Sequence, residues 1–238
     1  MRNILITNDD GIDSDGIIRL AAAAKRYGNV WIVAPVHERS AASHCISLRD
    51  HIDIMPHDFA IDNVKAFSCS GTPADCVRVG GLAVMDVRPD VVLSGINYGY
   101  NVASDVQYSA TAGAAFEARF QGYNAIALSE GAGPEHSVTD EYMIRILDEL
   151  IDEMPPKLCI WNVNFPDVKT DECRGILYDR KVSESMIYRD TYDLAGELPG
   201  GGRRYMVHGH RESRAEEGTD MEAVLAGYVS VGHVRNVG

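Results

Sequence analysis

Apolar residues in the first two thirds of the chain form short continuous runs that alternate with longer periodic segments. The periodic segments predict helices over residues 15–28, 109–122 and 137–154. The continuous runs have the length of strands and predict strands over residues 3–8, 29–35, 89–97, 124–130 and 157–167. Strands that are apolar on both faces and joined by helices are typical of parallel sheets covered on both sides. We therefore expect an α/β fold with a doubly wound, mostly parallel sheet.

Two local signals predict where these helices begin or end. Gly28 follows the first periodic segment and is expected to close that helix in a left-handed conformation. Ser137 and Asp140 have the spacing of a capping box and are expected to begin the third helix.

Two parts of the chain depart from this alternation. Residues 45–69 contain two short β-like runs and predict a β-hairpin inserted beside the sheet. After Asp167 the chain becomes polar and rich in glycine, which predicts a flexible loop over 196–205 and a last strand over 223–231. We therefore divide the chain into an α/β core, residues 1–168, and a C-terminal extension, residues 169–238, that serves as an oligomerisation arm.

Length and charge limit the classes of function. A chain of 238 residues suits one ordinary domain that needs no disulfide or metal for its stability. The formal net charge of −13 disfavours binding to a nucleic acid duplex, because such binding depends on Lys and Arg. The five cysteines are scattered along the chain, and we interpret them as reduced thiols. There is no signal-peptide pattern and no apolar run long enough for a bilayer, so we expect a cytoplasmic protein with no membrane partner.

Polar residues follow several predicted strands, at the edge where ligands bind in open α/β sheets. Asp9 and Asp10 follow the first strand, and two neighbouring carboxylates favour either a bound cation or simple exposure to solvent. Ser40 follows the second strand and Asn97 ends the third, although each also suits an ordinary loop or turn. Together these four groups form an all-oxygen set, which suits Mg²⁺ or Mn²⁺ and not zinc or copper.

An anion site is predicted at the start of the second helix. Ser109 and Thr111 lie where free backbone N–H groups and the helix dipole favour a phosphate, although Ser109 also suits a plain N-cap. Neither a GxGxxG nor a GxxxxGK[ST] motif is present, which argues against dinucleotide and P-loop chemistry. We assign no role to the eight histidines.

A series of motifs in a fixed order connects these residues. They read ILITNDDG, VAPVHERSAAS, SGTPADCV, PDVVLSGINYGYN, DVQYSATAGAAFEA, NVNFPD and EGTDMEAVLAGYVSV, and they extend over nearly the whole chain. With this set the chain resembles the SurE family, the survival-protein-E nucleotidases, which remove phosphate from nucleoside monophosphates. The ordered set is far more specific than any one of its members.

The resemblance implies a Rossmann-like fold and one divalent metal ion per subunit, Mg²⁺ or Mn²⁺. The residues implied as its ligands are Asp9, Asp10, Ser40 and Asn97, and the implied substrate contacts are Asn101, Ser109 and Thr111. The C-terminal arm of such proteins is exchanged between subunits of a homodimer or homotetramer. This chain has alanine at four positions where the family usually has glycine, namely Ala41, Ala103, Ala110 and Ala118. Because glycine permits a positive φ, these alanines are expected to narrow the pocket or strain its loops.

The expected reaction is metal-assisted hydrolysis of nucleoside 5′- or 3′-monophosphates, as in a 5′-nucleotidase of the acid-phosphatase type. Asp9 or Asp10 accepts the proton of the attacking water, while Ser109 and Thr111 offset charge on the phosphoryl oxygens. A non-enzymatic regulator that keeps the metal and nucleotide pocket is the alternative. A haloacid-dehalogenase-type phosphatase is a weaker one, because its two carboxylates are two residues apart and these are adjacent.

Overall fold

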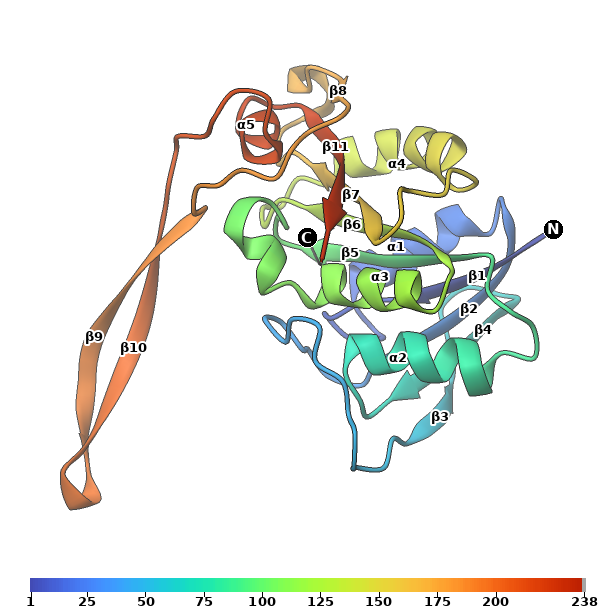
Figure 1. Cartoon of the computed structure of the whole chain (residues 1–238), viewed down its shortest axis with the longest axis horizontal. Helices are drawn as coiled ribbons and strands as arrows, with labels where there is room; N and C mark the ends of the chain where they lie inside the picture. Colours follow the sequence, from blue (N-terminus) through green and yellow to red (C-terminus); the bar gives the residue numbers. More distant parts are fainter. Residues whose placement is uncertain (237–238) are drawn as a thin grey trace.

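The computed structural model describes residues 1–236. A nine-stranded sheet with helices on both faces forms the body, and a two-stranded ribbon projects from one side of it (Figure 1). The strands of the main sheet are β1 (Arg2–Thr7), β2 (Gly28–Pro35), β3 (Ile54–His57), β4 (Val64–Cys69), β5 (Val91–Tyr98), β6 (Asn124–Glu130), β7 (Cys159–Phe165), β8 (Ile176–Leu177) and β11 (Val229–Arg235). The ribbon consists of β9 (Tyr188–Leu198) and β10 (Gly202–Arg211). The helices are α1 (Asp15–Ala24), α2 (Pro73–Val79), α3 (Ala110–Phe120), α4 (Ser137–Leu150) and α5 (Asp220–Leu225), and short helical turns lie at Gly80–Val84, Ala103–Gln107, Thr170–Glu172 and Pro199–Gly201.

The strand order of the main sheet is β3-β4-β2-β1-β5-β6-β7-β11-β8. Strands β4, β2, β1, β5, β6 and β7 are mutually parallel, whereas β3 and β11 run antiparallel to β4 and β7. The chain proceeds from β1 to β2 on one side and returns to β5 on the other, so the order reverses between β1 and β5. Their carboxyl ends flank the crevice in which such sheets bind ligands. The predicted doubly wound fold is confirmed.

The two faces of the sheet have separate apolar cores. Alternate residues of a strand point to opposite faces, and accordingly Ile4 and Ile6 of β1 join the cluster under α1 and α4, whereas Leu5 joins the cluster under α2 and α3. Figure 1 shows these two pairs of helices on opposite sides of the sheet. Strands covered in this way are apolar throughout, which is why their continuous runs were informative.

The predicted left-handed cap at Gly28 is wrong. Helix α1 already ends at Ala24, with Lys25 in a right-handed conformation, and Gly28 is the first residue of β2. Gly28 pairs with Arg2 of β1, and a Cβ atom at this position would lie 2.0 Å from the Arg2 carbonyl oxygen. The glycine is therefore required by close contact between strands and not by a helix end.

The predicted capping box at Ser137 and Asp140 is also wrong. His136 is the N-cap residue of α4, and its side chain makes no capping hydrogen bond. Instead, the backbone N–H of Ser137 donates to the Glu135 carboxylate over 3.0 Å. A carboxylate next to the free N–H groups of a helix serves the same purpose as a capping hydroxyl.

The hairpin predicted within residues 45–69 is present as β3 and β4. Strand β4 pairs with β2 in parallel register, from Val30–Val64 to Pro35–Cys69, so the hairpin extends the edge of the main sheet and does not lie beside it. The short helix α2 follows directly and was not predicted, because seven residues are too few for a periodic apolar pattern.

The C-terminal third differs most from the sequence prediction. The predicted flexible loop over 196–205 is wrong, because these residues are the tip and flanking strands of the ribbon β9–β10. The predicted strand over 223–231 is helix α5 followed by β11, which pairs with β7 inside the main sheet. Thr219 begins α5 by accepting the N–H of Glu222, a signal that the apolar run concealed. The root of the ribbon packs through Ile187 against Val102 and Met221.

Candidate active site

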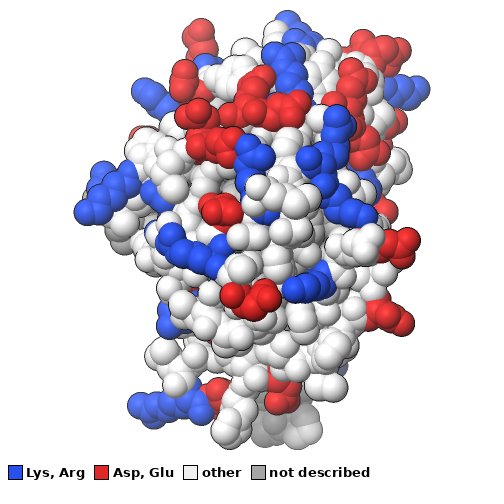
Figure 2. Space-filling model, turned by 90° about the vertical axis from the view of Figure 1, so that its right-hand side faces the viewer, with Lys and Arg blue, Asp and Glu red and all other residues white. Residues whose placement is uncertain are grey.

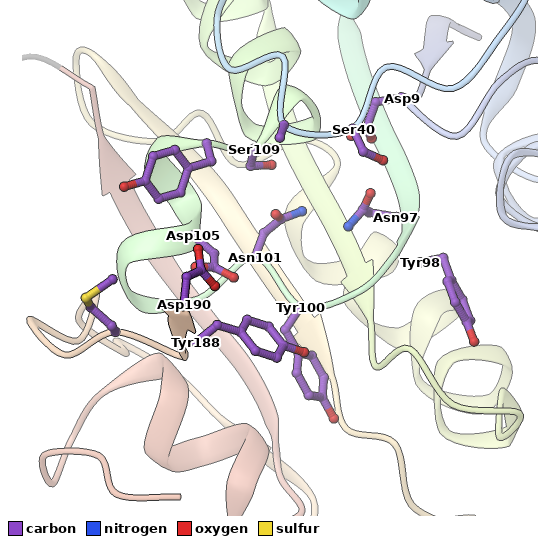
Figure 3. A pocket seen from close by; sticks show the side chains of 13 residues that line it. Asp9, Ser40, Asn97, Tyr98, Tyr100, Asn101, Asp105, Ser109, Tyr188 and Asp190 are labelled. Carbon is purple, nitrogen blue, oxygen red and sulfur yellow. The ribbon is translucent and has the colours of Figure 1, made fainter. Parts of the chain in front are cut away.

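A cavity of about 470 Å³ opens at the crevice between β1 and β5. Loops after β1, β2 and β5, the start of α3 and the root of the ribbon supply its walls. The lining residues are Asp9, Ser40, Ala41, Asn97, Tyr98, Tyr100, Asn101, Asp105, Tyr108, Ser109, Met186, Tyr188 and Asp190. Five predicted site residues therefore meet in one cavity, and Figure 3 shows Asp9, Ser40 and Asn97 together at one end of it.

Asp9 is the most buried acid of this cavity, with 3 % of its surface exposed. The Thr111 hydroxyl donates to its Oδ1 over 2.5 Å and fixes the carboxylate. Burial raises the pKa of Asp9 to about 6, with a further contribution from the charge of Asp10, while the Thr111 hydrogen bond opposes the shift. Within residues 1–236 no Lys or Arg forms an ion pair with Asp9 or Asp10. The ionised pair therefore lacks a positive partner from the protein itself.

Asp10 faces a different side of the same strand end. Its Oδ2 accepts the backbone N–H of Tyr98 over 3.2 Å, and it lines a second cavity together with Glu130 and His136. Burial, followed by repulsion from Glu38 and Glu130, raises the pKa of Asp10. The two adjacent carboxylates thus lie at the boundary between two cavities, and Tyr98 lines both.

The loop after β2 brings Ser40 to Asp9. The backbone N–H of Arg39 donates to the Asp9 carbonyl over 2.7 Å, which joins this loop to the end of β1. The Ser40 hydroxyl donates to Glu38 over 2.7 Å. Asn97 donates its Nδ2 to the Gly99 carbonyl over 2.7 Å, so that its Oδ1 remains available as an acceptor. Hydroxyl and amide oxygens are therefore placed beside the Asp9 carboxylate.

A kink in β5 gives Asn97 this position. The register between β5 and β6 shifts between Ser94 and Asn97. Gly95 lies in the shifted segment with φ of 139°, and a Cβ atom there would be 2.2 Å from the Leu128 carbonyl oxygen. Only glycine permits this close approach, which turns the last residues of β5 toward the cavity.

A buried amide network holds Asn101. Asn164 of β7 accepts the backbone N–H of Asn101 over 2.8 Å and donates to its carbonyl over 3.2 Å. Asn162 donates to the same carbonyl over 2.9 Å, and the Asn101 side chain donates to Ser129 over 2.8 Å. Asn101 therefore presents its remaining side-chain oxygen to the cavity from a fixed backbone. Asn164, near the end of β7, is fully buried and supports Asn101 from behind.

Ser109 and Thr111 lie at the start of α3 but have different neighbours. Ser109 is the N-cap, its hydroxyl accepts the N–H of Ala112, and it also lines the cavity. Thr111 is fully buried, is not among the lining residues, and directs its hydroxyl to Asp9. A phosphate contact by the Thr111 side chain stays a prediction.

The donor set suits a hard divalent cation. Two carboxylates, a hydroxyl and an amide oxygen are the ligand types that Mg²⁺ and Mn²⁺ prefer. In the described part of the chain, no three His, Cys, Asp or Glu side chains lie close enough together to hold a metal by themselves. The predicted site accordingly combines its carboxylates with neutral oxygens. The observation that favours a cation there is that, within residues 1–236, no Lys or Arg pairs with either carboxylate.

Sequence reasoning did not identify the aromatic part of the cavity. Tyr98 ends β5, Tyr100 and Tyr108 follow it, and Met186 and Tyr188 come from the root of the ribbon. The only signal in the sequence was the density of tyrosine in the segment NYGYN. Tyr188 lies 87 residues after the last residue of that segment and was predicted to lie in a separate extension. None of the eight histidines lines this cavity.

Comparison with known proteins decides the family. The sequence model described as "Survival protein SurE" matches residues 4–187. The chain is 39 % identical to the 5′-nucleotidase SurE of Ruegeria pomeroyi, with 98 % of this chain and 93 % of that protein aligned. The chain belongs to the SurE family.

Other SurE relatives agree with this assignment. The 5′-nucleotidase SurE of Geobacter sulfurreducens is 37 % identical over 96 % of this chain and 86 % of its own length. The crystal structure of the SurE protein from Aquifex aeolicus superposes with a TM-score of 0.81 at 32 % identity, covering 98 % of this chain and 93 % of that one. The shared SurE fold therefore includes the C-terminal third as well as the α/β core.

Proposed function

We propose that the protein is a divalent-metal-dependent 5′-nucleotidase, which hydrolyses nucleoside monophosphates to nucleoside and phosphate. The observation that supports this most is the buried Asp9 carboxylate, held by Thr111 and facing Ser40, Asn97 and Asn101 across one cavity. The SurE relatives named as 5′-nucleotidases support the substrate class. Within the proposal, one divalent ion per subunit, Mg²⁺ or Mn²⁺, would be held by Asp9, Asp10, Ser40 and Asn97.

Each residue then has a defined task. A divalent cation bound by these oxygens would neutralise charge on the phosphoryl group and polarise it. Asp9 or Asp10 accepts the proton of the attacking water, and Thr111 keeps the Asp9 carboxylate in a fixed orientation. Asn101 and Ser109 bind the phosphate at the start of α3, where the helix dipole offsets the charge that develops on its oxygens.

The surface of the molecule agrees with a small substrate. On the face shown in Figure 2, acidic and basic side chains alternate and leave apolar or neutral surface between them. A nucleic acid duplex needs a continuous basic surface that neutralises many phosphates. Residues 1–236 contain no helix that is both long and apolar enough to cross a membrane.

We further propose that the ribbon β9–β10 joins copies of this chain into a homodimer or homotetramer. Directly paired residues Tyr192–Val207 and Leu194–Tyr205 alternate along the two strands and form one apolar face. Between 51 % and 65 % of each of these side chains is exposed in the single chain. An isolated two-stranded ribbon is marginally stable in water, so this face favours a partner surface. The five free thiols support a cytoplasmic location.

The test of the proposed function is the replacement of each acid by its amide. Asp9→Asn and Asp10→Asn should each lower kcat/KM for AMP with Mn²⁺ by at least about a thousandfold, since each removes a charged metal ligand. Asp13→Asn is the matched control, because within residues 1–236 the exposed Asp13 side chain bonds only to the half-buried His57. Calorimetric titration with Mn²⁺ should show weakened binding in the first two variants and unchanged binding in the control.

Full activity in either site variant would contradict the metal site. Tight nucleotide binding without release of phosphate, across Mg²⁺ and Mn²⁺, would instead favour the non-enzymatic regulator. No observation favours that alternative at present, because the polar groups around Asp9 are all in place.

A further inference from the structure

The candidate active-site cavity has two chemically different ends. Figure 3 shows Asp9, Ser40 and Asn97 at one end, here called the inner end, and Tyr100, Tyr188, Asp105 and Asp190 at the other, here called the outer end. The inner end is the proposed phosphate site. The outer end would therefore contact the group to which the phosphate is attached.

The outer end has a fixed Tyr100 side chain and a held backbone beside Tyr188. The Tyr100 hydroxyl accepts the backbone N–H of Asp167 over 2.7 Å, and the Arg211 guanidinium lies 5.6 Å from the Tyr100 ring centroid. Tyr188 follows the buried Ile187, whose carbonyl accepts the N–H of Glu212 over 2.9 Å. Tyr188 itself is 41 % exposed. Accessible aromatic rings on a held backbone are suitable stacking partners for a planar base.

The charged side chains of the outer end are both acidic. Asp105 lies on the turn Ala103–Gln107 and Asp190 on β9. Burial raises the pKa of Asp105, the charge of Asp190 adds to this shift, and the Ser104 hydroxyl opposes it. Neither Lys nor Arg is among the residues that line the cavity, and Arg211 stacks on Tyr100 without joining the lining. A second phosphate at the outer end would thus face two carboxylates, with no Lys or Arg in the cavity lining to offset their charge.

We propose that the outer end selects substrates in which a single phosphate is attached to an uncharged aromatic nucleoside. Tyr188 contributes by stacking, and Asp105 and Asp190 reject substrates that have a second phosphate. This inference rests on the proposed function, because that function assigns the phosphate to the inner end. It makes the root of the ribbon part of the substrate site, so that specificity depends on a segment outside the α/β core.

The charge effect is tested with two substrates that differ by one phosphate, AMP and adenosine 3′,5′-bisphosphate. Whichever phosphate of the bisphosphate occupies the inner end, its other phosphate must lie toward the outer end. The unmodified protein should prefer AMP in kcat/KM by at least about tenfold. Asp105→Asn with Asp190→Asn should lower this preference by about tenfold, whereas Asp193→Asn, a matched change on the opposite face of β9, should leave it unaltered. If the double variant is unstable, Asp190→Asn alone is tested in its place, because Asp190 is exposed and its replacement should not disturb the fold.

The stacking effect is tested with AMP and the aliphatic substrate glycerol 2-phosphate. Tyr188→Ala should raise KM for AMP about tenfold and leave KM for glycerol 2-phosphate nearly unchanged, while Tyr188→Phe should retain the KM for AMP. Equal effects of Tyr188→Ala on both substrates would overturn the stacking role. An AMP preference that is the same with and without the carboxylates would overturn the charge effect.

Failure of the proposed function is recognised separately. If neither AMP nor glycerol 2-phosphate is hydrolysed with Mg²⁺ or Mn²⁺, the nucleotidase proposal is wrong. The selectivity is then measured by calorimetry as the ratio of the dissociation constants of AMP and the bisphosphate in the presence of Mn²⁺. A ratio that the Asp→Asn variants do not change overturns the inference in this setting too.

Discussion

Two of the four alanines that replace the usual family glycines have backbone conformations that favour glycine. Ala41 has φ of 58° and Ala103 has φ of 53°, whereas Ala110 and Ala118 lie in the right-handed helix α3. The expectation of strain is thus confirmed at two positions. The loops keep the left-handed conformation despite the Cβ atom, which costs an alanine about 1 to 2 kcal/mol.

Ala41 offers a clean test of this strain, because its side chain is exposed at the rim of the cavity. Ala41→Gly should raise the free energy of unfolding by about 0.5 to 1 kcal/mol, since the relief of strain exceeds the entropy that glycine adds to the unfolded chain. Urea denaturation measures the change. Ala42→Gly, in the same loop but without a positive φ, should lower the free energy of unfolding. A loss of stability in Ala41→Gly would contradict the assigned strain.

At the scale of elements, helix α2 illustrates what apolar periodicity does not detect. The segment Thr72–Asp75 forms a capping box, with Pro73 in the first turn, and this polar signal was present in the sequence. Asp75 also accepts the backbone N–H and the hydroxyl of Ser47, which joins the loop after Cys45 to the start of α2. A polar cap rather than an apolar stripe therefore defines this short helix.

The cap of α2 should make stability dependent on pH. Burial acts to raise the pKa of Asp75, but hydrogen bonds from Ser47 and Thr72 outweigh it and lower the pKa. The pKa of Asp75 is lower in the folded state than in the unfolded state. The ionised carboxylate therefore stabilises the fold at any pH above the unfolded-state pKa, and this stabilisation is lost as the pH falls through the folded-state pKa.

Asp75→Asn should therefore lower the free energy of unfolding by about 2 kcal/mol near pH 7. The difference from the unmodified protein should shrink as the solution is acidified below about pH 4. Urea titrations over a range of pH measure both effects. Asp62→Asn is the control, because the Asp62 side chain makes no hydrogen bond within residues 1–236. A pH-independent difference would show that shape, and not charge, is responsible.

At the scale of the whole molecule, the ribbon β9–β10 links assembly to the active site. Tyr188 and Asp190, at its root, lie on the same face of β9 as Tyr192 and Leu194, because strand residues alternate between faces. One face of a single strand thus lines the cavity near the body and presents apolar side chains farther out. Figure 1 shows that this strand extends from the body into the projecting ribbon. Contacts between copies along this face would also act on the position of Tyr188.

Charge on the apolar face of the ribbon should separate the copies. Tyr192→Asp together with Leu194→Asp should reduce the mass measured by light scattering to that of one chain, because burying two carboxylates in an apolar contact is unfavourable. Asp193→Asn, on the opposite face, should leave the mass unchanged. A mass that equals one chain in the unmodified protein, or that the double variant does not alter, would contradict the proposed assembly role.

The body of the fold and the polar ends of its strands were accessible from the sequence. Continuous apolar runs and periodic segments predicted the strands and helices of the body, since a strand covered on both faces must be apolar throughout. The rule that open α/β sheets bind ligands at the carboxyl ends of their strands selected Asp9 and Asn97. The structure places both at the reversal between β1 and β5. Ser40 follows β2 and Ser109 begins α3, so both were accessible from the predicted element ends, whereas Asn101 was implied by the family resemblance alone.

Only the tertiary structure decided the rest. Sequence pattern cannot show that Asp10 and Asp9 face different cavities, that Thr111 holds Asp9 from behind, or that Asn164 fixes Asn101, because these depend on which side chains meet across strands. The tip of the ribbon is rich in glycine and polar residues, so in sequence it was indistinguishable from a loop. Residues near one another in sequence determine local structure and strand ends, whereas the outer wall of the cavity joins segments far apart in the chain and exists only once they pack.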